Sequence, residues 1–108
     1  MTAAKLVKDT IAAHKVVMFS KSYCPYCNKA KAALATVMKA ANYFVIELDK
    51  RNDGDEIQDE LLKVTGGRSV PRVFIGGEFI GGGDDTARLA GTGELKALIE
   101  AAGGKADL

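Results

Sequence analysis

Apolar side chains recur every three or four residues in several stretches of this chain, and short unbroken apolar runs separate those stretches. The helical spacing occurs at 6–14, 30–41, 57–64 and 95–102, as expected for helices that bury one face. Runs rich in β-branched and aromatic residues occur at 16–19, 43–48, 73–75 and 78–80, which is typical of strands. With a short helix from about 84 to 90, the predicted order is α-β-α-β-α-β-β-α-α.

Several glycines and capping residues mark where these elements begin and end. Gly76-Gly77 separates two strand-like runs and predicts a hairpin. Asp53, with Glu56 three residues later, resembles a capping box at the start of the third helix, and Gly66-Gly67 ends it. Thr92 is expected to cap the last helix, and the tail from Gly103 is expected to fray.

This pattern predicts an α/β fold with a four-stranded mixed sheet and about five helices on its two faces. Strands separated by helices favour parallel pairing through right-handed crossovers, and the hairpin adds an antiparallel pair. The 108 residues suit a single domain covering 1–108.

Composition narrows the classes of function. With 47% hydrophobic residues the chain is globular, and a net charge of +1 without a basic block argues against nucleic-acid binding. No apolar stretch approaches the ~20 residues of a membrane span. The first seven residues lead directly into helical periodicity, unlike a secretory signal. We therefore expect a cytoplasmic protein without a membrane partner.

The two cysteines of the chain form the motif Cys24-Pro25-Tyr26-Cys27, directly after the first predicted strand. Pro25 suits the first helical position, which makes Cys24 the N-cap and places Cys27 one turn inside the helix. The free N–H groups of Tyr26 and Cys27, together with the helix dipole, favour a thiolate at Cys24. The motif therefore predicts an attacking sulfur with a resolving sulfur beside it, in a reducing compartment.

Other cysteine chemistries fit the sequence less well. His14 is the only histidine and lies far from the motif, so we expect it to be structural or solvated. Two cysteines and one histidine are too few for an ordinary four-ligand zinc site within one chain, and no metal is expected. The Cys-x5-Arg spacing needed for phosphate-ester attack is absent.

Three landmarks in this order resemble the dithiol glutaredoxins: Cys24 to Cys27, Ser69-Val70-Pro71, and Gly81-Gly82 followed by acidic residues. The resemblance covers roughly residues 3 to 102. It implies a thioredoxin-like fold, with glutathione as co-substrate. It also implies a monomer that reduces protein disulfides and glutathione mixed disulfides, so that the partners are glutathione and such proteins.

The resemblance also implies roles for residues around the cysteines. Lys21 corresponds to a lysine that holds the glycine carboxylate of glutathione, and Gln58 and Arg68 resemble residues that complete this contact. Tyr26 would pack along the ligand. The bond between Val70 and Pro71 would be cis, which leaves the Val70 backbone free to pair with the ligand.

The γ-glutamyl end of glutathione would lie at Gly82, Asp84 and Asp85, with its carboxylate on backbone N–H groups and its amine on an acidic side chain. Two positions depart from the common pattern. Asp84 stands where Ser or Thr is frequent; we expect it to be an N-cap whose charge opposes the ligand carboxylate. Gly83 replaces a cysteine that many relatives carry, which removes a third thiol.

Two alternative functions remain open. Two protomers could hold a [2Fe–2S] cluster on Cys24 and two glutathiones, although Pro25 stands where cluster-binding relatives favour smaller residues. A thioredoxin served by a flavoprotein reductase is disfavoured by Tyr23, where thioredoxins carry tryptophan, and by the missing Gly-Pro pair between the cysteines.

Overall fold

The computed structural model describes residues 2–108. In chain order, its elements are α1 (Ala3–Ala13), β1 (Val16–Ser20), α2 (Pro25–Ala35), η1 (Ala40–Asn42), β2 (Phe44–Glu47), η2 (Leu48–Lys50), α3 (Gly54–Thr65), β3 (Arg72–Ile75), β4 (Glu78–Gly81), α4 (Gly83–Thr92) and α5 (Glu94–Ala101). The predicted order of helices and strands is confirmed, with the short 3₁₀ turns η1 and η2 added. No helix within residues 2–108 combines the length and the apolar character needed to cross a bilayer.

The four strands form one mixed sheet in the order β2-β1-β3-β4. β1 pairs with β2 in parallel, and β3 and β4 form the expected antiparallel hairpin. The parallel pairing expected for the third strand is wrong, because β3 runs antiparallel to β1.

The path between β2 and β3 explains this reversal. Glu47 at the end of β2 lies beside Ser20, and Arg72 at the start of β3 lies beside Phe19. The chain therefore leaves and re-enters the sheet at the same end. α3 carries it about 18 Å away, and the six residues from 66 to 71 are long enough to bring it back.

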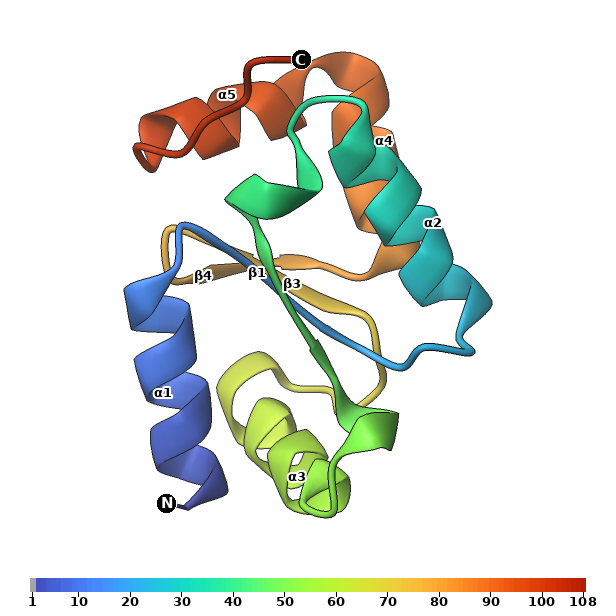
Figure 1. Cartoon of the computed structure of the whole chain (residues 1–108), viewed down its shortest axis with the longest axis vertical. Helices are drawn as coiled ribbons and strands as arrows, with labels where there is room; N and C mark the ends of the chain where they lie inside the picture. Colours follow the sequence, from blue (N-terminus) through green and yellow to red (C-terminus); the bar gives the residue numbers. More distant parts are fainter. Residues whose placement is uncertain (1) are drawn as a thin grey trace.

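Helices cover both faces of the sheet, with α1 and α3 on one face and α2, α4 and α5 on the other (Figure 1). β1 lies in the middle and is buried along its whole length. Its alternate residues enter opposite cores: Val16 and Met18 pack with α2, α4 and α5, whereas Val17 and Phe19 pack with α1 and α3. This accounts for the unbroken apolar run in the sequence, since a strand covered on both faces shows no alternation.

The C-terminal boundary of α2 differs from the prediction. α2 ends at Ala35 rather than near 41, where the Thr36 hydroxyl donates to the Ala33 carbonyl at 2.6 Å. Val37 and Met38 lie in the turn that follows the helix, and their side chains are buried in the core from there. Their helical spacing in the sequence therefore does not mean that the helix continues.

The predicted caps also differ in part. Asp53 is the N-cap residue of α3, as predicted, but its carboxylate makes no capping hydrogen bond and binds the Arg51 guanidinium at 2.7 and 3.0 Å instead. The N-cap of α5 is Gly93, with φ of 84°. Thr92 belongs to α4, although its hydroxyl accepts a hydrogen bond from the Glu94 N–H at 3.3 Å.

The C-terminal tail packs against the body of the molecule instead of fraying. Ala106 is buried in the core shared by α2, α4 and α5. The Leu108 N–H donates to the Val37 carbonyl at 3.3 Å. Two features explain this packing. Ala106, after Gly103 and Gly104, supplies an apolar side chain for the core, and the early end of α2 leaves the Val37 carbonyl available as an acceptor.

Candidate functional site

Cys24 lies at the N-terminus of α2, where the sheet ends. It is the N-cap residue, with extended φ and ψ of −85° and 120°, and Pro25 begins the helix as predicted. Of the two N–H groups expected at its sulfur, that of Cys27 donates to it at 3.4 Å. The Cys24 side chain is partly exposed, so a helix N-terminus presents this sulfur to solvent.

Cys27 has different surroundings although it lies only one turn away. Its side chain is buried, and its sulfur accepts a hydrogen bond from the Lys21 N–H at 3.4 Å. Burial raises the pKa of the Cys27 thiol, while hydrogen bonds from the Lys21 backbone and the Ser20 hydroxyl act in the opposite direction. The site therefore combines an accessible sulfur with a buried one whose pKa lies above the ordinary value of a cysteine thiol.

The segment from Ser69 to Pro71 approaches the cysteines from the other side. The peptide bond between Val70 and Pro71 is cis, as the resemblance implied. The Val70 carbonyl oxygen lies 3.8 Å from the Cys24 sulfur. Because Pro71 is buried, this backbone is held beside the reactive atom.

One hollow of about 400 Å³ opens from this segment toward α4. It contains six predicted site residues that come from three separate parts of the sequence, together with three others. Its lining residues are Tyr26, Ser69, Val70, Pro71, Arg72, Gly82, Gly83, Asp84 and Asp85.

The N-terminus of α4 differs in detail from the prediction. The N-cap is Gly82, and Asp84 is the second helical residue, so the expectation that Asp84 caps the helix is wrong. Its carboxylate pairs with the Lys29 ammonium on α2 at 2.5 Å, whereas Asp85 accepts a hydrogen bond from the Gly82 N–H at 3.3 Å. Asp84 therefore does not occupy the backbone N–H groups at the start of α4, and its charge is paired with that of Lys29.

Gly83 lets α4 approach α2 closely at this point. A Cβ atom at Gly83 would lie 2.5 Å from the carbonyl oxygen of Tyr26, in the first turn of α2. The absence of a side chain therefore has a packing reason, in addition to removing a third thiol.

A second hollow, of about 220 Å³, lies on the side of Lys21. Lys21 and Gln58, predicted to act together, both line it, along with Tyr23, Leu48, Asp49, Arg51, Asn52, Gly54 and Asp55. Arg51 and Asp49 were not identified from the sequence. The parallel register between β1 and β2 could have indicated Asp49, because it brings the ends of these two strands together.

Two predicted residues of this group have structural partners. Gln58 is buried, and its side-chain nitrogen donates to the Arg68 carbonyl at 2.8 Å, which fastens the segment leading to Val70. The Arg68 guanidinium lies 3.2 Å from Asp59 and 3.9 Å from Asp55. Arg68 is not among the residues that line the second hollow.

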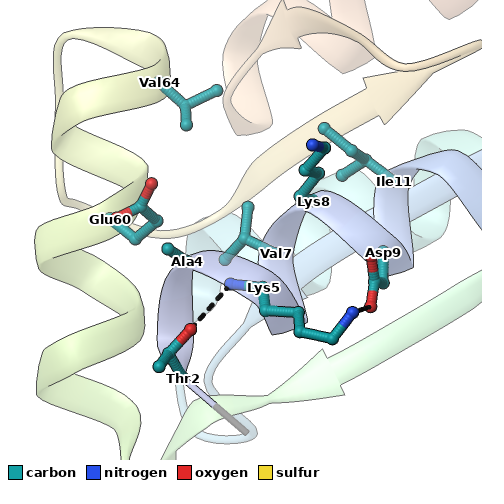
Figure 2. Close-up of a pocket in the computed structure, with 9 residues that line it drawn as sticks. All are labelled: Thr2, Ala4, Lys5, Val7, Lys8, Asp9, Ile11, Glu60 and Val64. Atoms are coloured by element: carbon teal, nitrogen blue, oxygen red, sulfur yellow. Dashed lines mark hydrogen bonds and ion pairs between the residues drawn. The ribbon is translucent and has the colours of Figure 1, made fainter.

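The largest of these hollows is elsewhere, between α1 and α3 (Figure 2). It measures about 600 Å³ and is lined by apolar side chains such as Val7 and Ile11, with charged groups such as Lys8 and Glu60. None of its nine lining residues is a cysteine or a histidine. His14 also lies outside the site, where its ring stacks on Phe44 at 4.3 Å.

No group of three or more His, Cys, Asp or Glu side chains in residues 2–108 is arranged to hold a metal ion. Independently of that, an accessible sulfur lies one helical turn from a buried one, an arrangement that suits sulfur exchange, and the two hollows beside Cys24 can receive a ligand.

Comparison with known proteins agrees with the resemblance that the sequence motifs indicated. The sequence profile of a family described as Glutaredoxin matches residues 16–80. Glutaredoxin-C8 of Oryza sativa subsp. japonica is 49% identical over 100 residues, which cover 91% of this chain and 74% of that protein. Glutaredoxin-C4 of Arabidopsis thaliana is 48% identical over 102 residues, which cover 94% and 74%.

Solved structures agree with the fold. The crystal structure of oxidized glutaredoxin 2 from Chlamydomonas reinhardtii has a TM-score of 0.90 at 52% identity, covering 95% of this chain and 98% of that one. The buckwheat glutaredoxin–glutathione complex has a TM-score of 0.86 at 38% identity, covering 96% and 93%. The thioredoxin-like fold is thereby confirmed.

Proposed function

Because the chain belongs to the glutaredoxin family, we propose that Cys24 and Cys27 make it a glutathione-dependent thiol–disulfide oxidoreductase. The observation that carries this proposal is the position of the Cys24 sulfur. It caps α2, accepts the Cys27 N–H at 3.4 Å and faces the Val70 carbonyl. A partly exposed sulfur at a helix N-terminus is a setting that favours the nucleophilic thiolate.

With a glutathionylated protein, one cysteine is sufficient. The Cys24 thiolate attacks the glutathionyl sulfur, a new bond joins Cys24 to glutathione, and the protein thiolate leaves. The thiolate of a second glutathione then attacks the same glutathionyl sulfur. Glutathione disulfide departs, and Cys24 returns to its reduced form.

With a protein disulfide, both cysteines take part. Cys24 forms a mixed disulfide with one sulfur of the substrate, and the other substrate sulfur leaves as a thiolate. Cys27 loses its proton and attacks Cys24, which releases the reduced substrate and joins the two cysteines. Two glutathiones then reduce this internal disulfide.

Glutathione would span the two hollows, consistent with a complex of this kind in buckwheat glutaredoxin. Its glycine carboxylate would bind Lys21 in the second hollow. Its peptide backbone would pair with Val70, and its γ-glutamyl end would lie at the start of α4, near Gly82 and Asp85. Tyr26 and Pro71 line the path between these contacts.

This function is favoured over the iron–sulfur carrier. The family match and the glutathione-bound structural relative both point to thiol chemistry, and Pro25 remains the residue that argues against cluster binding. We also propose that the protein acts as a cytoplasmic monomer without nucleic-acid or membrane partners. The net charge of +1 offers little attraction for nucleic acid. Both cysteines belong to the motif, which leaves none for the structural disulfides that are common in secreted proteins.

Single-cysteine variants test the proposed function. Cys24→Ser is expected to abolish both activities, because the attacking sulfur is lost. Cys27→Ser is expected to keep the reduction of a glutathionylated peptide and to lose most reduction of a protein disulfide. Initial rates with glutathione and each substrate measure this split. Equal loss in both variants would contradict the one-cysteine route.

A further inference from the structure

We propose that Asp49 is a positioning residue for the segment that joins β1 to α2 and carries Lys21 and Cys24. This inference rests on the proposed function. Asp49 contacts Ser22, which is 27 residues earlier in the chain, with both carboxylate oxygens. One oxygen accepts the Ser22 N–H at 2.9 Å, and the other accepts the Ser22 hydroxyl.

Asp49 extends from a well-anchored part of the molecule. It belongs to η2, whose first residue, Leu48, is 2% exposed and packs among Phe19, Ile57 and Leu61. Gly54 packs so closely on η2 that a Cβ atom there would lie 2.7 Å from the Leu48 carbonyl oxygen. The backbone that carries Asp49 is thus anchored to the core through Leu48, while the carboxylate itself lies at the surface beside Ser22.

The segment that Asp49 binds is much less buried than Leu48. Ser22 and Tyr23 are exposed, and Tyr23 retains 69% of its accessible surface. An exposed segment without such a contact would open locally at little cost in free energy. A charged acceptor with two hydrogen bonds is among the stronger contacts available to it.

The backbone of Lys21, which directly precedes Ser22, is hydrogen-bonded to both cysteines. The Lys21 N–H donates to the Cys27 sulfur at 3.4 Å, and the Lys21 carbonyl accepts the Cys24 N–H at 3.1 Å. Lys21 and Asp49 also line the same hollow. Holding Ser22 therefore sets where the Lys21 ammonium meets the carboxylate of glutathione.

Positioning and simple electrostatics predict opposite effects. If Asp49 acted only through its charge, its removal would favour an anionic ligand and would lower the KM for glutathione. If it acts by holding Ser22, Asp49→Ala raises that KM by about three- to tenfold with a smaller change in kcat. Asp49→Asn stays near the wild-type value, because its amide keeps an acceptor and a donor for Ser22.

The test measures kcat and KM for glutathione with a glutathionylated peptide. The variants are Asp49→Ala, Asp49→Asn and Ser22→Ala, and Asp9→Ala on α1 controls for loss of a carboxylate. Hydrogen exchange of the Ser22 amide reports on the segment directly and is expected to accelerate in Asp49→Ala. Ser22→Ala should have an intermediate KM.

A lower KM in both Asp49 variants would overturn the proposal in favour of a charge effect. An unchanged KM with a reduced melting temperature would overturn it in favour of a structural role. A wild-type protein that is inactive with glutathione would instead refute the proposed function, and the exchange rate at Ser22 would still test the contact itself.

Discussion

Cys24 and Cys27 are separated by one helical turn, yet their environments suit different steps of thiol exchange. Cys24 is partly exposed at the helix N-terminus, whereas Cys27 is buried beneath the Lys21 backbone. An attacking sulfur needs access to substrates. A resolving sulfur needs only to reach its neighbour, so it can be protected from other reactions until a mixed disulfide forms.

This difference predicts a pH dependence of the resolving step. Burial raises the pKa of the Cys27 thiol, so near neutral pH it is mostly protonated, and its thiolate fraction increases as the pH rises. Below that pKa, the rate of internal disulfide formation should therefore increase about tenfold per pH unit. A mixed disulfide formed on Cys24 at low pH, followed by a pH jump without glutathione, measures this rate.

The Cys27→Ser variant is the control for this experiment, because its mixed disulfide should persist at every pH. A release rate in the wild type that does not change between about pH 6 and pH 8 would mean that Cys27 is already ionised there.

At the scale of elements, α2 and α4 pack against each other. This contact places the cysteine motif beside the start of α4, where the γ-glutamyl end of glutathione is proposed to bind. Gly83 lies at this contact, and its missing Cβ accommodates the Tyr26 carbonyl. Gly91 belongs to the same helix but has no neighbouring atom within 4 Å of its own Cβ position. Substitutions at these two glycines can therefore separate the effect of close packing on stability from the effect of helix propensity.

Gly83→Ala is expected to lower the free energy of unfolding by about 1–3 kcal/mol, because the added methyl group would push α4 away from α2. Gly91→Ala is expected to raise it by up to about 1 kcal/mol, since alanine favours a helix more than glycine does. Urea denaturation of the two variants measures both changes. If Gly83→Ala proved as stabilising as Gly91→Ala, the close approach at Tyr26 would be refuted.

At the scale of the whole molecule, local sequence patterns predicted the individual helices and strands more accurately than the contacts between distant segments. The hairpin at Gly76-Gly77 and the cap at Cys24 depend on neighbours in the sequence, and both are confirmed. The antiparallel entry of β3 depends on the path of residues 66–71, which periodicity does not reveal.

The same distinction applies to the candidate site. The motif and the family landmarks identified eight of the residues that line the two hollows beside Cys24, although they also included Arg68, which lines neither. They did not reveal that Lys29 pairs with Asp84 or that Gln58 holds the Arg68 carbonyl. Such pairs join separate segments of the chain, so they depend on how these segments pack together, which the pattern of one segment does not show.

The packed tail gives a prediction at this scale. Ala106 is 7% exposed and lies in the core with Val37 and Ile99. Ala106→Asp is expected to destabilise the protein by about 1–3 kcal/mol, because it buries a polar group without a partner. Ala41→Asp, on the exposed η1 turn, is the control and should change stability little. Equal melting temperatures for the two variants would show that the tail contributes nothing.

The capping role of Cys24 has a consequence for the direction of electron flow. In the proposed reaction, the Cys24 sulfur attacks as a thiolate whose negative charge lies at the positive end of α2, whereas in a disulfide this sulfur carries no charge. The helix therefore stabilises the reduced form relative to the disulfide. A pair whose reduced form is stabilised has a higher reduction potential, so the helix that organises the motif also favours the acceptance of electrons from a small thiol.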